Sequence, residues 1–80
     1  MVQEAEEYLR SLGFLRLRVR SHGHMARIEL QEQDMARAMN SREEIAKTLK
    51  AIGFDYVALD LQGYRSGSMN EVLIRSKVNQ

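Results

Sequence analysis

Cysteine is absent from the 80 residues, which excludes disulfides, iron–sulfur ligation and a thiol nucleophile within this chain. Its absence is compatible with the cytoplasm, which is the location we expect. A large charge of one sign is also missing, because 12 basic and 11 acidic residues leave a net charge of +1. We therefore expect no general nucleic-acid binding, and any anion site must come from a local arrangement of residues.

Long apolar segments are missing too. No run approaches the roughly 20 residues that a bilayer-spanning helix requires, so we expect no membrane partner. The first residues, MVQEAEEYLR, are acidic and amphipathic, unlike a secretory signal. A hydrophobic fraction of 44% and a length of 80 residues are typical of one globular domain with one modest core.

Two similar segments organise the chain. AEEYLRSLGF ends at Phe14, and EIAKTLKAIGF ends at Phe54, 40 residues later. In both segments, apolar residues at helical spacing lead to the dipeptide Gly-Phe. A glycine in this position is typical of a helix end, and the phenylalanine after it can fold back onto the last turn. The pattern predicts helices near residues 2–12 and 42–52.

Alternating apolar and polar residues predict three strands. LRLRVR and MARIEL belong to strands near residues 14–20 and 25–31, and His22-Gly23 is the predicted turn of the hairpin between them. FDYVALDL contains the third strand, near residues 55–61, which points Val57, Leu59 and Leu61 one way and Tyr56, Ala58 and Asp60 the other.

Two further signals concern helices. Ser41-x-x-Glu44 has the spacing of a capping box, so we expect Ser41 to cap the second long helix. Asp34–Met39 can add a short helical turn, and we expect Met35 and Met39 on its apolar side to belong to the core.

The predicted order of elements is α-β-β-α-β. A right-handed crossover through the second long helix makes the second and third strands parallel neighbours. The fold class is therefore α+β: a two-layer sandwich with a three-stranded mixed sheet and the helices on one face, close to a ferredoxin-like domain without its first strand. Without that strand, one edge of the sheet would keep unpaired backbone N–H and C=O groups. We therefore expect a homo-oligomer or docking onto a larger domain.

Arginines concentrate on the predicted open face of the sheet. With the turn as predicted, Arg16 lies opposite Glu29 and Arg18 lies opposite Arg27, while Arg20 extends the same row. Like charges directly opposite each other are destabilising unless something lies between them. Two interpretations stay open: solvated arginines whose stems shield the sheet, or a bound phosphate or carboxylate.

The stretch GYRSGSMN, residues 63–70, favours the second interpretation. It is glycine-rich and leads into Ser68-x-x-Glu71, another capping box, and backbone amides in such a turn favour anions. It lacks the Gly-Lys-Ser/Thr ending of a Walker loop, and it can also be a plain turn followed by a helix cap. The predicted phosphate site comprises Arg18, Arg20, Arg65, Ser66 and Ser68, with Arg27 nearby.

Other chemistry has weaker signals. His22 and His24 flank a glycine and either bind a metal or stand exposed at the turn. Glu6 or Glu7 with Glu29 could form a carboxylate metal site or belong to solvated faces. No Ser/His/Asp arrangement with supporting motifs occurs, so we assign no catalytic residue.

Three segments together resemble a known family. RVRSHGHMARIE (18–29), IGFDYVALDLQGYRSGSMNEVL (52–73) and the leading AEEYLRSLGF are similar to the C-terminal region of LarE-type proteins. These are ATP-dependent sulfur transferases of the PP-loop superfamily, which help to build the nickel-pincer nucleotide cofactor of lactate racemase. In that family an N-terminal PP-loop domain adenylates a pyridinium dicarboxylic acid mononucleotide, and a cysteine or an iron–sulfur cluster delivers sulfur.

The resemblance implies roles for individual residues. Arg18, Arg20 and Arg65 correspond to residues that bind the substrate phosphate. Glu6 and Glu29 match acidic residues implicated in metal binding. A further family acid has its nearest match in Asp34.

The chain also departs from the family. It has no S-G-G-x-D-S PP-loop, so ATP and magnesium would bind outside these residues, and without cysteine the chain cannot donate sulfur. We therefore predict that residues 1–80 form a C-terminal substrate-phosphate-binding and assembly domain, inactive alone and without a cofactor of its own. Its expected partners are a phosphorylated nicotinate-type mononucleotide and the N-terminal PP-loop domain.

Two alternatives remain open from the residues alone. One is a small ferredoxin-like module that binds a metabolite or dimerises, without any tie to sulfur transfer. The other is a partner-binding domain whose basic sheet face holds an acidic protein or a nucleic acid. An S-G-G-x-D-S motif upstream in the parent reading frame would favour the sulfur transferase.

Overall fold

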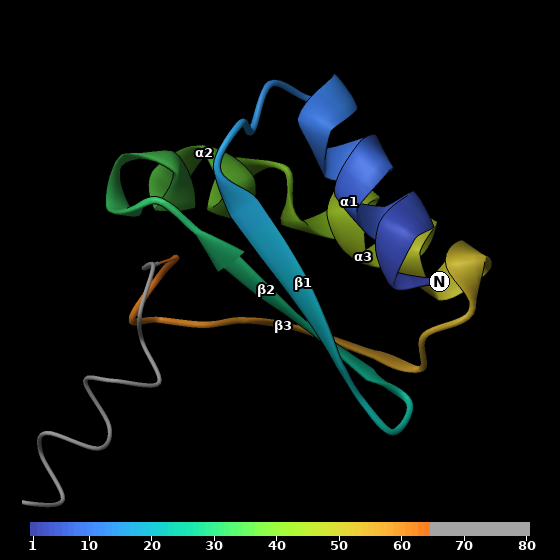
Figure 1. Ribbon diagram of the computed structural model, residues 1–80. Helices are drawn as coiled ribbons and strands as arrows, with labels where there is room; N and C mark the ends of the chain where they lie inside the picture. The colour runs from blue at the N-terminus through green and yellow to red at the C-terminus, as the bar shows by residue number, and fades with distance from the viewer. Residues whose placement is uncertain (65–80) are drawn as a thin grey trace, which may run out of the picture.

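The computed structural model describes residues 1–64; the predictions for Arg65, Ser66, Ser68 and the second capping box lie outside the described residues. In Figure 1 the helices lie on one side of a small sheet, and the α+β two-layer sandwich that the sequence predicts is confirmed. The elements are α1 (Val2–Ser11), β1 (Leu17–His22), β2 (Met25–Leu30), a 3-10 turn η1 (Glu32–Asp34), α2 (Met35–Asn40), α3 (Arg42–Ile52) and β3 (Tyr56–Leu59).

The sheet has the order β1-β2-β3. β1 and β2 form an antiparallel hairpin, and β3 lies parallel to β2 after the crossover through α3. The predicted mixed sheet is therefore confirmed, and β1 and β3 are its two edges. No helix within residues 1–64 is long and apolar enough to span a bilayer.

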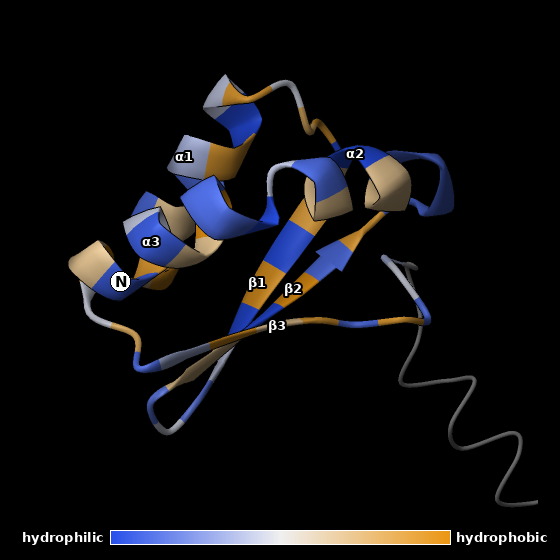
Figure 2. Cartoon of the chain, turned by 180° about the vertical axis from the view of Figure 1, so that it is seen from behind, coloured by the Kyte–Doolittle hydropathy of each residue, from blue (hydrophilic) through white to orange (hydrophobic). Residues whose placement is uncertain are grey.

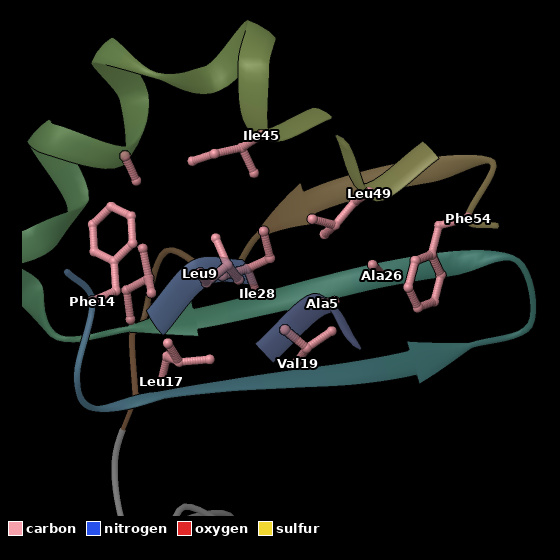
Figure 3. Packing of buried hydrophobic residues seen from close by; sticks show 12 residues of the cluster. Ala5, Leu9, Phe14, Leu17, Val19, Ala26, Ile28, Ile45, Leu49 and Phe54 are labelled. Atoms are coloured by element: carbon pink, nitrogen blue, oxygen red, sulfur yellow. The ribbon is translucent and has the colours of Figure 1, made fainter. Parts of the chain in front are cut away.

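The repeated Gly-Phe ending works as the sequence predicts. The Phe14 N–H donates to the Leu9 carbonyl at 3.3 Å, and the Phe54 N–H donates to the Leu49 carbonyl at 3.2 Å. This bond returns the chain across the helix end, to a carbonyl that also accepts the Leu12 N–H at 3.1 Å in the first helix and the Gly53 N–H at 3.2 Å in the second. Both phenylalanine rings are buried, and Figure 3 shows them at opposite ends of the core.

The core fills the space between the helices and one face of the sheet. Figure 2 shows the alternation of apolar and polar residues along β1 and β2 that produces this face. Leu17 and Val19 from β1 and Ile28 from β2 meet Leu9 of α1 and Leu49 of α3 (Figure 3). The opposite face of β1 and β2 consequently carries the charged residues, because successive side chains of a strand point to opposite faces.

The register of the hairpin differs from the prediction. Arg18, not Arg16, lies opposite Glu29, and Arg20, not Arg18, lies opposite Arg27. The reason is the turn: His22 pairs with Met25, so the loop is Gly23-His24 instead of His22-Gly23. Moving the turn by one residue shifts the pairing by two residues, which leaves every side chain on its predicted face.

Two strands are shorter than predicted at one end: β1 starts later than residue 14, and β3 ends before residue 61. β1 begins at Leu17, because the residues before it connect the end of α1 to the sheet. Leu15 belongs to this connection and is 77% exposed. β3 ends at Leu59, because a turn follows in which the Gly63 N–H donates to the Asp60 carbonyl at 3.1 Å. Leu61 is consequently 86% exposed instead of facing the core.

Two expectations about α2 and α3 are also corrected. α3 begins after Ser41 as predicted, but the Ser41 side chain makes no capping hydrogen bond. Ser41 ends α2 as well as preceding α3, and its backbone (φ −107°, ψ 18°) lacks the extended conformation typical of such a cap. Met39 is 51% exposed, so Ala38 and not Met39 is the buried residue of α2.

Candidate anion-binding site

A cavity of about 670 Å³ lies along β1, at the edge of the sheet. Arg16, Arg18 and Arg20 line it from β1 and the segment before it, Glu6 lines it from α1, and Tyr64 lines it from the chain after β3. The alternation of side chains along β1 accounts for this row, because residues two apart on a strand share a face. The structure thus brings Arg18 and Arg20 of the predicted phosphate site to one cavity.

Tyr64 ties the start of the GYRSGSMN stretch to this cavity. Its N–H donates to the Leu30 carbonyl at 2.7 Å, which fixes the chain at the end of β2. Its ring centre lies 6.0 Å from the guanidinium carbon of Arg18, within the range of a cation–π contact. Our reading of the sequence gave Tyr64 no role, although an aromatic residue directly before Arg65 was the available signal.

Glu29 organises the arginines on the open face. It is only 5% exposed, and its Oε2 accepts hydrogen bonds from Arg20 Nε at 3.1 Å and Arg27 Nη2 at 3.2 Å. Arg27 Nε also lies 3.6 Å from the Asp60 carboxylate on the far side. The repulsion predicted between Arg18 and Arg27 falls instead between Arg20 and Arg27, where Glu29 relieves it without a bound anion.

Arg18 and Arg16 differ from these paired arginines. Within residues 1–64, neither of them forms an ion pair with a carboxylate. Their charges are therefore not neutralised by a neighbour in the described part of the chain. Four arginines and one glutamate line the cavity, which gives the lining a net charge of +3. Arg10 is paired with Glu6 at 3.9 Å and Arg20 with Glu29, so Arg16 and Arg18 carry the charge that no described carboxylate balances.

The acidic residues matched to a family metal site have protein partners in the structure. Glu6 Oε2 accepts a hydrogen bond from the Val19 N–H of β1 at 3.0 Å, and Glu29 bonds the arginines described above. Asp34 lies 3.5 Å from Arg37. Among the described residues, no three His, Asp or Glu side chains are grouped to hold a metal ion. The metal role of Glu6 and Glu29 stays a prediction.

The two histidines lie at the tip of the hairpin, and His22 follows Arg20 by two residues along β1. His24 is largely exposed, and its Nδ1 lies 3.7 Å from the Asp55 carboxylate. His22 ends β1 and lines the outer end of the cavity. This placement agrees with exposed turn histidines.

No family model matches the chain. It is 46% identical over 77 residues to pyridinium-3,5-bisthiocarboxylic acid mononucleotide synthase of Lactiplantibacillus plantarum, an alignment that covers 96% of the chain. The resemblance to the LarE-type family is confirmed.

The alignment covers 28% of that synthase, so the chain spans a little over a quarter of its relative. An uncharacterized protein of Synechocystis is 45% identical over 76 residues, again 28% of its length. An uncharacterized protein of Methanocaldococcus jannaschii is 40% identical over 65 residues, or 25% of its length. All three alignments therefore cover about a quarter of the relative's own length.

Proposed function

We propose that the chain is the C-terminal domain of an ATP-dependent sulfur transferase. This enzyme would thiolate a pyridinium dicarboxylate mononucleotide for the nickel-pincer cofactor of lactate racemase. The likeness to a mononucleotide synthase over nearly the whole chain supports this assignment. An N-terminal PP-loop domain, acting in the cytoplasm, would bind ATP. The sulfur source would also lie outside these residues.

The domain's own task is to bind the substrate phosphate in the cavity along β1. The single observation that carries this proposal is the row of arginines on one cavity wall, two of them unpaired within residues 1–64. Guanidinium groups offer paired N–H donors that match phosphate oxygens. The cavity volume of about 670 Å³ lies in the range of small-ligand sites and is large enough for a mononucleotide.

Arg18 and Arg20 would act differently on the phosphate. Arg18 brings a charge that no described carboxylate neutralises, whereas Arg20 shares its charge with Glu29 and offers its remaining N–H groups as directed donors. Arg65, Ser66 and Ser68 would complete the site, because they follow Tyr64 directly in the sequence. No step of sulfur transfer is assigned to this chain.

A ligand pair tests the proposal. The full 80-residue chain is titrated with nicotinate mononucleotide and, separately, with nicotinate riboside, which lacks the phosphate, while backbone amide shifts are recorded. We expect the mononucleotide to move the amides of residues 18–20 and 64–68, and the riboside to leave them still. Arg18→Gln should remove most of the response, and Arg42→Gln on α3 should keep it. Equal responses to both ligands would reject phosphate recognition at this cavity.

Assembly is the second part of the proposed function. An apolar cavity of about 450 Å³ lies between α2, α3 and β3, and the half-exposed Met39 lines it. β3 is also an edge strand, which leaves its outer backbone groups without a partner strand within residues 1–64. We propose that a second copy of the chain covers this region in a homo-oligomer.

A further inference from the structure

Glu29 is the only buried charged residue in the part of the chain that the structure describes. It stands on the open face of the sheet, where a glutamate would ordinarily be solvated. Its burial comes with two guanidinium partners, Arg20 at 3.1 Å and Arg27 at 3.2 Å, both bonded to the same oxygen, Oε2. A buried carboxylate with such partners has a defined position, because losing either bond would leave a charge poorly satisfied.

These contacts form a chain across all three strands. Asp60, just after β3, lies 3.6 Å from Arg27 on β2, Arg27 bonds Glu29 on β2, and Glu29 bonds Arg20 on β1. Two arginines and two carboxylates alternate along this ion-pair network, so the four charges of the network sum to zero. Arg20 therefore adds little net charge to the cavity, and its contribution to a ligand has to be directional.

Glu29 contacts Arg20 from outside the cavity wall. Arg20 lines the cavity, whereas Glu29 and Arg27 do not. The bond to Glu29 uses Nε, so the terminal Nη groups of Arg20 remain available to a ligand. A free arginine side chain has many rotamers, and holding it at Nε reduces the freedom that it loses when a ligand binds.

We propose that Glu29 is a positioning residue that fixes Arg20 with its Nη groups toward the cavity along β1. This inference rests on the proposed phosphate binding at that cavity. Glu29 acts through its acceptor atom and not through its charge, since a negative charge near a phosphate by itself weakens binding. The distinction between acceptor and charge makes the proposal testable with two substitutions at one position.

Glu29→Gln keeps an acceptor oxygen but removes the charge, whereas Glu29→Leu removes both. With inorganic phosphate as the probe, we expect Glu29→Gln to bind at least as tightly as the unmodified chain. We expect Glu29→Leu to bind about tenfold more weakly, the size of one charge-assisted hydrogen bond. Glu32→Leu in η1 is the matched control, since it makes the same chemical change at an exposed residue that lines neither cavity, and it should leave the affinity unchanged.

A second readout needs no ligand. The Arg20 side-chain Nε–H resonance should be distinct and slow to exchange in the unmodified chain and in Glu29→Gln, and it should lose both properties in Glu29→Leu. Tighter binding by both variants would overturn the proposal and make Glu29 a competitor of the anion. Equal loss in both would overturn it too, in favour of a role for charge. If phosphate fails to bind the unmodified chain, the proposed function fails, while the Nε–H signal still decides whether Glu29 holds Arg20.

Discussion

The guanidinium of Arg37 lies over the ring of Phe14, with 4.1 Å between its central carbon and the ring centre. The same side chain donates from Nη1 to the Leu12 carbonyl at 2.8 Å, at the open C-terminal end of α1. One arginine of α2 therefore covers a buried aromatic ring and satisfies a carbonyl that α1 leaves unpaired. It joins two helices that are separated in sequence by the whole hairpin.

Arg37→Ala should lower the free energy of unfolding by about 1–2 kcal/mol, because it removes one hydrogen bond, one partly exposed cation–π contact and the surface ion pair with Asp34. Arg37→Lys should recover only part of this loss, since an ammonium group lacks the planar face that stacks on the ring. Urea denaturation would measure both. Lys47→Ala, at an exposed position of α3, is the control and should stay within about 0.5 kcal/mol. An equally small effect at Arg37 would contradict the prediction.

Gly63 connects stability to the candidate site. Its φ is +82°, and an added Cβ would lie 2.8 Å from the backbone oxygen of Leu30, the same oxygen that accepts the Tyr64 N–H. Gly63→Ala should therefore destabilise the fold by about 2–3 kcal/mol, through backbone strain plus this clash. It should also displace Tyr64 from Arg18 and weaken phosphate binding.

Gly23 provides the control for Gly63. Its φ is +60°, but nothing lies within 4 Å of the position where a Cβ would stand. Gly23→Ala should cost only the strain, about 1–2 kcal/mol, and leave phosphate affinity unchanged. Thermal unfolding and phosphate titration of the two variants would separate strain from clash. Identical losses of stability and affinity in both would refute the role of the Leu30 contact.

Glu6 protects the edge of the sheet. Its carboxylate accepts the outward-facing Val19 N–H at 3.0 Å, which gives β1 a partner where a neighbouring strand is missing within residues 1–64. Glu6→Ala should speed amide exchange at Val19 by about tenfold, the effect of one hydrogen bond to a charged group. Glu7→Ala on the same helix should leave that amide unchanged. Unaltered exchange at Val19 in Glu6→Ala would show that the bond does not protect this edge.

Local signals in the sequence were sufficient for most of the fold. The Gly-Phe dipeptides predict both helix ends because the determining contact, such as Phe14 to Leu9, joins residues only five positions apart. The faces of β1 and β2 follow from alternation alone. The register does not, because Gly23 fits a two-residue turn with either neighbour, and only the paired strands decide which residue joins it.

The candidate site was predictable in its residue types and in the shared face of Arg18 and Arg20, but not in its ion pairs. Arg18 and Arg20 share a cavity as expected, since they are two apart on one strand. The pairing of Glu29 with Arg20 depends on the register, and that of Arg27 with Asp60 depends on a parallel contact between segments 33 positions apart. No local pattern encodes such contacts, so the sequence could not show which arginines are neutralised.

The apolar cavity beside β3 leads to a prediction about self-association. Met39 lines this cavity and is 51% exposed. Burying its apolar side chain against a second copy would stabilise the association. The 80-residue chain should therefore show a mass that rises with concentration in sedimentation velocity. Met39→Glu should reduce the association, because a charge buried in an apolar contact is costly. Leu15→Glu is the control: Leu15 is 77% exposed but lies on the other cavity, so its substitution should leave the association constant unchanged. A mass independent of concentration, or an equal effect of both substitutions, would exclude this region as the contact between copies.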